Sequence, residues 1–336
     1  MAGPGEELVV AVTRVLDLDP ATYEPHLLHR SERTWGETNC YVDIWIEVLH
    51  ALGLEPLAAS AFALATDFEG DQWTFFKFRP EDLRELYGIR VFEMNPWRPL
   101  VDHVVEHLSS GRLITVEVDS WYLPDTAGVS YRIEHTKTTI VPNAIDLQGR
   151  RLGYFHGPSY FELEGEDFDG VLRLGDTAQV GALPPYVETV RLDGLIRLPA
   201  DELVVASRRS LQEQAASLPA DNPMPRFQAR LDADLPWLRA AGIDGFHQWA
   251  FGTFRQCGAS AEVGAAYLAW LQDRSDGTAL DDAIESLRMI AADCKSLEFA
   301  LARLARGRNV DVSATFDNMA ASWARVRETL TEDHGL

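Results

Sequence analysis

The hydrophobic pattern of this 336-residue chain changes near residue 199, and this change constrains the fold more than any other feature. Before it, short segments rich in β-branched and aromatic residues alternate with helical segments, which is typical of an α+β domain with an antiparallel sheet. After it, apolar residues recur every three or four positions, which is typical of packed helices. The sequence therefore predicts an α+β domain over residues 1–198 and an α-helical domain over residues 199–336.

The composition argues against two classes of partner. The formal net charge is −22, and no stretch of Lys and Arg interleaved with aromatic residues reverses it locally, so we expect no nucleic-acid partner. No apolar run reaches the roughly 20 residues of a membrane span, and the acidic N-terminus does not look like a secretory signal. We therefore expect no membrane partner and a cytoplasmic location. The three cysteines lack the spacing of a disulfide framework or a zinc site, and we expect no cofactor.

Cys40 is the clearest candidate for chemistry. Asn39 is a favourable N-cap, and the run that follows, CYVDIWIEVLHAL, has helical apolar spacing up to Gly53. A helix that begins at Cys40 would favour the thiolate, because unpaired N–H groups and the helix dipole stabilise negative charge there. The competing interpretation is an inert, buried thiol, as is common for cysteine. We expect Cys257 and Cys294 to be of this inert kind.

His135 is the candidate base. It lies in residues 131–141, which read as a strand, and a loop at 142–149 leads to a second strand at 151–156. In papain-like proteins the nucleophile heads a long helix, the base lies on a sheet strand, and an acid or amide orients the base. The chain has this order, so we expect a papain-like cysteine transferase or peptidase domain.

The other members of such a site remain open. The position expected to hold an orienting Asp or Asn falls near the end of the strand at 151–156, where neither is present. The candidates for the third catalytic residue are therefore His156, Asn143, Asp146 and Asp119. The Gln of the usual oxyanion hole is also missing, and the candidate donors are Thr34, Asn39 and the backbone N–H of Cys40.

Several polar residues are candidates for substrate binding. Residues 67–77 combine acids with Gln, Trp and Lys, which suits an amine, and residues 71–78 read as a strand. Other acids flank Cys40, and a lysine follows His135. The candidates are Glu37, Asp43, Glu69, Asp71, Gln72, Trp73 and Lys137. The alternative is that the acids are ordinary loop and helix-start residues and that Trp73 belongs to the core.

Two further clusters have simpler explanations. His103-Val-Val-Glu-His107 has the spacing of an inverted zinc-peptidase motif, but no third ligand is identifiable. Its apolar face predicts that both histidines lie on a solvated face, and we expect no metal. Arg303, Arg306 and Arg308 form a basic cluster that is either a solvated helix end or a dock for a phosphate or an acidic carrier protein.

Long blocks of the sequence resemble an uncharacterised bacterial domain-of-unknown-function family, number 1839. The resemblance covers nearly the whole chain and implies no established activity. The blocks that carry it are residues 35–47, from Trp35 to Glu47, residues 67–77, residues 122–125, residues 134–140 and residues 154–156.

A second resemblance points to an activity. Cys40, the run Val118-Asp-Ser-Trp-Tyr-Leu-Pro124 and His135 are similar in order to the papain-like acyltransferases of butirosin biosynthesis. This resemblance implies natural-product chemistry in which Cys40 accepts an acyl or aminoacyl group from a carrier-protein thioester and passes it to a small-molecule amine. The alternatives are a cysteine amidase or peptidase, in which water replaces the amine, and a non-catalytic binding protein on the same fold.

Overall fold

The computed structural model describes residues 12–30, 32–175, 183–275, 279–308 and 310–332. The chain folds into two compact units. The first unit comprises Met1–His26, Asp43–Gly53 and Gly88–Leu195, and the second comprises Leu27–Val42, Leu54–Tyr87 and Ile196–Leu336. The chain thus passes from one unit to the other more than once, and two segments from the N-terminal half belong to the same unit as the C-terminal helices.

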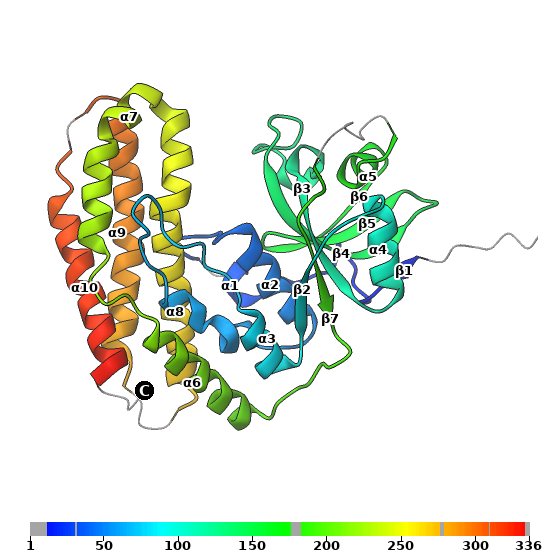
Figure 1. Ribbon diagram of the computed structural model, residues 1–336, viewed down its shortest axis with the longest axis horizontal. Helices are drawn as coiled ribbons and strands as arrows, with labels where there is room; N and C mark the ends of the chain where they lie inside the picture. Colours follow the sequence, from blue (N-terminus) through cyan, green and yellow to red (C-terminus); the bar gives the residue numbers. More distant parts are fainter. Residues whose placement is uncertain (1–11, 31, 176–182, 276–278, 309, 333–336) are drawn as a thin grey trace, which may run out of the picture. The chain divides into compact units, whose positions relative to one another are not determined.

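The first unit is built on an antiparallel sheet (Figure 1). Its strand order is β2-β7-β3-β4-β5-β6, with β1 paired to β4 off this path. The strands are β1 (Thr13–Arg14), β2 (Arg90–Met94), β3 (Leu113–Asp119), β4 (Lys137–Asp146), β5 (Arg151–His156), β6 (Ser159–Glu164) and β7 (Val187–Arg191). Asp119 pairs with Lys137, and Val141 pairs with Phe155. The end of β3, the start of β4 and the end of β5 therefore lie at the same end of the sheet.

Short helices complete the first unit. Helix α4 (Leu100–Ser109) packs against β1, β3 and β4, and α5 (Glu166–Leu172) contacts β3 and β6. Two 3-10 turns, η2 (Ser120–Tyr122) and η3 (Pro124–Thr126), follow β3 directly, and α5 also packs on η2. Helix α2 (Cys40–Ala51) begins with residues that belong to the second unit and continues into the first.

The second unit is helical. Helix α9 (Asp281–Ala305) packs against α7 (Met224–Ala250), α8 (Gln256–Gln272) and α10 (Ser313–Glu332), and the four run side by side in Figure 1. A π-helical segment, η5 (Phe251–Arg255), joins α7 to α8. The 3-10 segment η1 (Pro56–Leu64) is almost wholly buried and contacts α8 and α6 (Ala200–Ala216). The remaining helices are α1 (Leu27–Arg30) and α3 (Pro80–Tyr87).

The predicted antiparallel sheet in the N-terminal part and the helical C-terminal region are confirmed. Two local predictions are wrong. Residues 71–78 form no strand beyond an isolated bridge between Phe68 and Trp73, because the aromatic side chains there pack into the helical unit. Residues 131–136 are turns and loop, and β4 instead runs from Lys137 to Asp146.

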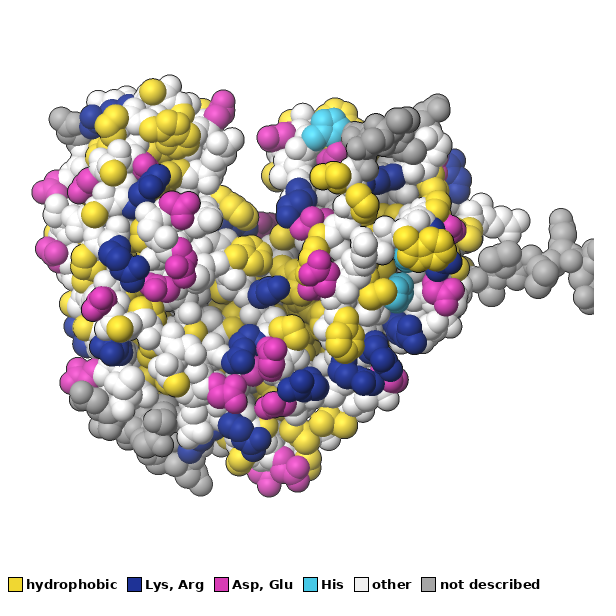
Figure 2. Space-filling model, viewed as in Figure 1, with side chains coloured by type: hydrophobic (Ala, Val, Ile, Leu, Met, Phe, Trp, Pro, Cys, Tyr) yellow, Lys and Arg dark blue, Asp and Glu magenta, His cyan; other side chains and the backbone are white. Residues whose placement is uncertain are grey.

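Two findings concern the surface. Acidic and basic side chains are interspersed on the face drawn in Figure 2, with hydrophobic side chains between them. No helix in the described ranges is both long and apolar enough to cross a membrane.

Candidate active site

The start of α2 is fixed by Asn39. Its Oδ1 accepts the backbone N–H of Val42 at 2.9 Å, as an N-cap does, and its Nδ2 donates to the carbonyl of Phe76 at 3.0 Å. The predicted helix start at Cys40 is therefore confirmed. Asn39 is fully buried and holds the helix end in place, whereas Cys40 is a free thiol of intermediate exposure.

The segment before Cys40 is anchored to the helices of its own unit. The backbone N–H groups of Thr34 and Trp35 donate to the carboxylate of Glu262 on α8, at 2.8 and 3.0 Å. Arg255 donates to the carbonyl of Thr38 and to the carboxylate of Glu37. Cys40 therefore follows a stretch of backbone whose position is held by side chains of η5 and α8.

His135 carries an oriented imidazole. Its Nδ1 lies 2.6 Å from Oδ2 of Asp119, and its ring stacks on the indole of Trp121 with 4.5 Å between ring centroids and 11° between planes. The imidazole is 62% exposed and the Asp119 carboxylate 32% exposed. Among the candidates for the third residue, Asp119 is the one in contact with His135, and it lies on the strand before His135 rather than on the strand after it.

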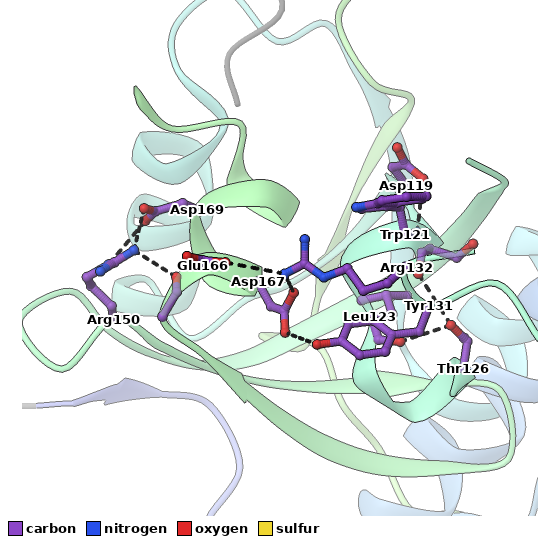
Figure 3. Close-up of polar contacts among 12 residues, drawn as sticks. Asp119, Trp121, Leu123, Thr126, Tyr131, Arg132, Arg150, Glu166, Asp167 and Asp169 are labelled. Atoms are coloured by element: carbon purple, nitrogen blue, oxygen red, sulfur yellow. Dashed lines mark hydrogen bonds and ion pairs between the residues drawn. The ribbon is translucent and has the colours of Figure 1, made fainter. Parts of the chain in front are cut away.

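The loop that presents His135 is tied down at several points. Figure 3 shows Arg132 and Tyr131 converging on the carboxylate of Asp167 on α5. Arg132 donates to Oδ1 at 2.6 Å and Tyr131 to Oδ2 at 2.9 Å, and the backbone N–H of Arg132 donates to the carbonyl of Trp121. Such contacts limit the freedom of the loop, so the imidazole projects from a defined backbone.

A second histidine at the same end of the sheet, His156, is buried. His156 places Nδ1 2.5 Å from Oδ2 of Asp125 and Nε2 2.9 Å from Oγ1 of Thr138. Tyr154 donates to Oδ1 of the same Asp125, and burial raises the pKa of Tyr154 strongly. Both ring nitrogens of His156 are therefore occupied, unlike the exposed His135.

Two further candidates, Asn143 and Asp146, make contacts within the sheet and its turn. Asn143 is fully buried in β4, where Oδ1 accepts the N–H of Leu16 and Nδ2 donates to the carbonyl of Leu16 and to Tyr160. Asp146 ends β4, and the N–H of Gly149 and the guanidinium of Arg151 lower its pKa. The sequence placed both in a loop, but β4 extends through them, and their polar groups serve strand and turn contacts.

The predicted substrate residues are scattered. Trp73 is buried against Phe68 and Phe227, so it belongs to the core. Glu69, Asp71 and Gln72 lie on an exposed turn, and Asp43 is buried within α2. Glu37 pairs with Arg255, and Lys137 pairs with Glu117 at 2.6 Å. The structure does not bring these residues together as one set.

The histidines of the zinc-like motif are buried, so the predicted solvated face is wrong. The backbone N–H of Trp97 donates to Nε2 of His103, and His107 Nδ1 lies 3.1 Å from Oγ1 of Thr189. Burial, followed by nearby arginines, lowers the pKa of both histidines. Within the described ranges, no group of three or more His, Cys, Asp or Glu residues is placed to hold a metal ion.

Two residues that contact the histidines of the site were not predicted from the sequence. Trp121 and Asp125 were not predicted, although the acid after Pro124 and the aromatic residue after β3 are visible in the sequence. Cys257 and Cys294 are buried as predicted, and burial raises the pKa of Cys294 well above its ordinary value.

Comparison with known families covers most of the chain. A model of the DUF1839 N-terminal domain matches residues 24–192, and a model of the DUF1839 C-terminal domain matches residues 200–332. No curated protein matches the chain. The similarity to butirosin-type acyltransferases therefore stays a prediction.

Proposed function

The chain belongs to the DUF1839 family, and we propose that it is a cysteine-dependent acyltransferase. Cys40 accepts an acyl or aminoacyl group from a carrier-protein phosphopantetheine thioester and transfers it to a small-molecule amine. His135 is the general base, and Asp119 orients it. The order of the nucleophile at a helix start followed by a histidine beside a sheet strand is similar to that of papain-like proteins, although Asp119 comes before His135 in the chain.

The observation that carries the proposal is the exposed, oriented imidazole of His135. With Nδ1–H donated to Asp119, the tautomer leaves Nε2 as the proton acceptor. Imidazole is the side chain best suited to exchange protons near neutral pH, and an acyl transfer needs such a group at both of its steps. His156 is the weaker candidate base, because Thr138 and Asp125 occupy both of its nitrogens.

The environment of Cys40 supports its role as nucleophile. The thiol opens a 12-residue helix, where backbone N–H groups stabilise a thiolate and an oxyanion on an attached acyl group. Cys257 and Cys294 lie within packed helices, and only 3% and 0% of their surfaces are exposed. The reactive cysteine is therefore assigned to position 40.

The reaction has two balanced steps. In the first, the Cys40 thiolate attacks the thioester carbonyl, the bond to the carrier sulfur breaks, and the carrier thiol leaves with the proton held by His135. In the second, the amine attacks the acyl-Cys40 carbonyl, His135 takes the amine proton, and the Cys40 thiolate is released. Water in place of the amine gives hydrolysis by the same residues.

Intact-protein mass spectrometry tests the proposal directly. The enzyme is mixed with a panel of acyl- and aminoacyl-pantetheine thioesters and quenched at short times. We expect one acyl adduct that peptide mapping places on Cys40, absent in Cys40→Ala and present in the matched control Cys257→Ala. Addition of small amines should discharge the adduct to an amide faster than water hydrolyses it. An adduct retained in Cys40→Ala, or none with any thioester, would rule the proposal out, and discharge to acid alone would indicate a hydrolase.

A further inference from the structure

A groove on the helical unit gathers arginines in an otherwise acidic chain. It has a volume of about 430 Å³ and lies between α6 and the end of α8. Its lining residues are Asp201, Val204, Val205, Arg208, Arg209, Gln212, Arg274 and Ser275. Three arginines and one aspartate thus line the groove, although the chain as a whole carries a net charge of −22.

A contact between α6 and α8 lies next to these arginines in the chain. The hydroxyl of Ser207 on α6 lies 3.2 Å from the hydroxyl of Tyr267 on α8, and Tyr267 donates to the Ser207 carbonyl. Arg208 and Arg209 directly follow Ser207 in the chain. Arg274 follows Tyr267 in the chain and lies in the turn just after α8 ends at Gln272. The Ser207–Tyr267 contact therefore joins the two segments whose arginines line the groove.

The arginine at the end of α8 is held in a defined position. Its guanidinium lies 5.1 Å from the centre of the Trp270 ring and donates to the Trp270 carbonyl at 3.2 Å. Neither Arg209 nor Arg274 forms an ion pair with a carboxylate in the described part of the chain. Ser275 adds a buried hydroxyl without a hydrogen-bond partner among those residues. Arg209, Arg274 and Ser275 therefore supply hydrogen-bond donors to the groove that no carboxylate of the described residues pairs with.

We propose that this groove binds the phosphate group of a small phosphate ester. Guanidinium groups match phosphate oxygens with paired, charge-assisted hydrogen bonds. The net negative charge of the chain repels anions at long range, so an anion is held only where several donors act together. Val204 and Val205 provide apolar contact for the organic part of the ligand. The proposal concerns binding alone and does not depend on the chemistry of Cys40.

Isothermal titration calorimetry of the full chain with inorganic pyrophosphate and with methyl phosphate tests the proposal. We expect saturable binding of both, weakened by salt, and about tenfold or greater loss of affinity in Arg209→Gln and in Arg274→Gln. Arg306→Gln is the matched control, because Arg306 is exposed at the end of α9 outside the groove. Its affinity for each probe should lie within about twofold of that of the unchanged chain.

Three outcomes would overturn the proposal. These are no binding of either probe at millimolar concentration, equal affinity in Arg209→Gln and the unchanged chain, and equal binding of succinate, which would make the groove a general anion site. Loss of binding in Arg306→Gln would instead assign the phosphate to the basic cluster at 303–308. Arg209→Gln keeps the test interpretable if Arg274→Gln disturbs the packing on Trp270, and thermal unfolding of each variant detects such a disturbance.

Discussion

Asp119 uses its two carboxylate oxygens for different purposes. Oδ1 accepts the N–H of Trp121 at 3.0 Å and caps η2, whereas Oδ2 holds the imidazole of His135. An asparagine keeps a capping oxygen and presents an N–H group to the imidazole. Because that N–H meets Nδ1, the ring is driven to the tautomer whose proton is on Nε2, and the base is lost.

We therefore expect Asp119→Asn to lower the rate of acyl transfer by about 10² to 10⁴-fold while changing the free energy of unfolding by less than about 1 kcal/mol. Single-turnover acyl transfer and urea unfolding measure the two effects. Glu162→Gln removes an exposed charge on β6 and should keep most of the activity. A rate for Asp119→Asn within twofold of the unchanged enzyme would contradict the assigned role.

Single residues were predicted from sequence where their role depends on local structure. Cys40 and Asn39 followed from a helix start, which is encoded by neighbours in the chain. Trp121 and Asp125 were missed because their partners, His135 and His156, come from turns and strands distant in sequence. Asn143 was misassigned because its partner Leu16 lies at the far end of the unit's sequence.

At the scale of elements, α3 and α6 meet through a buried acid. Asp82 of α3 is 3% exposed, and its Oδ1 accepts the hydroxyl of Ser210 on α6 at 2.8 Å. Its Oδ2 has no hydrogen-bond partner in the described part of the chain. Burial is the largest cause that raises the pKa of Asp82 above its ordinary value of 3.8, and the bond from Ser210 lowers it in part.

The folded state therefore binds this proton more tightly than the unfolded state does. The resulting stabilisation is fully present below the ordinary pKa and is lost as the pH rises through the folded-state value. Asp82→Asn has no such proton to lose, so its free energy of unfolding relative to the unchanged chain should rise between about pH 4 and pH 7. Urea unfolding at both pH values measures this difference. Glu81→Gln, an exposed acid in the same turn, should show no such rise, and a constant difference for Asp82→Asn would refute the prediction.

Helix α7 contains a break at Gly242, where φ is 66° and ψ is −143°. Nothing lies within 4 Å of a Cβ at this position, so the cost of a side chain would come from the backbone conformation alone. We expect Gly242→Ala to lower the free energy of unfolding by about 1–2 kcal/mol. Gly252→Ala has an ordinary backbone conformation and should be nearly neutral or stabilising. Equal unfolding midpoints in urea for Gly242→Ala and the unchanged chain would contradict this view.

Elements were predicted well where one periodicity dominates the sequence. Helix α2 and strand β5 have bounds close to those predicted, because the cap and the residue spacing agree locally. Residues 71–78 have strand-like composition, yet they have no strand partner, and Trp73 packs on Phe227 of α7. Residues 131–136 are held as turns by Asp167 of α5, a contact that no local pattern encodes.

At the scale of the whole molecule, the formal charge of −22 should oppose folding through self-repulsion. Exposed ion pairs contribute little each, so screening should relieve more repulsion than it removes attraction. We expect Tm to rise by a few degrees as NaCl increases from about 10 mM to about 500 mM. Differential scanning calorimetry measures the shift. A fall in Tm over this range would show that attraction between ion pairs outweighs the repulsion between like charges.

The central claim joins Cys40 to a base far along the chain, and the rate of thiol alkylation tests it most directly. Each cysteine is labelled with iodoacetamide between about pH 5 and pH 9 and quantified by mass spectrometry, in the unchanged chain and in His135→Ala. The account predicts fast labelling of Cys40 near pH 6, slowed by the loss of His135, with Cys257 and Cys294 unreactive. Labelling of Cys40 that is as slow as that of the buried thiols, or that does not respond to His135→Ala, would contradict the account.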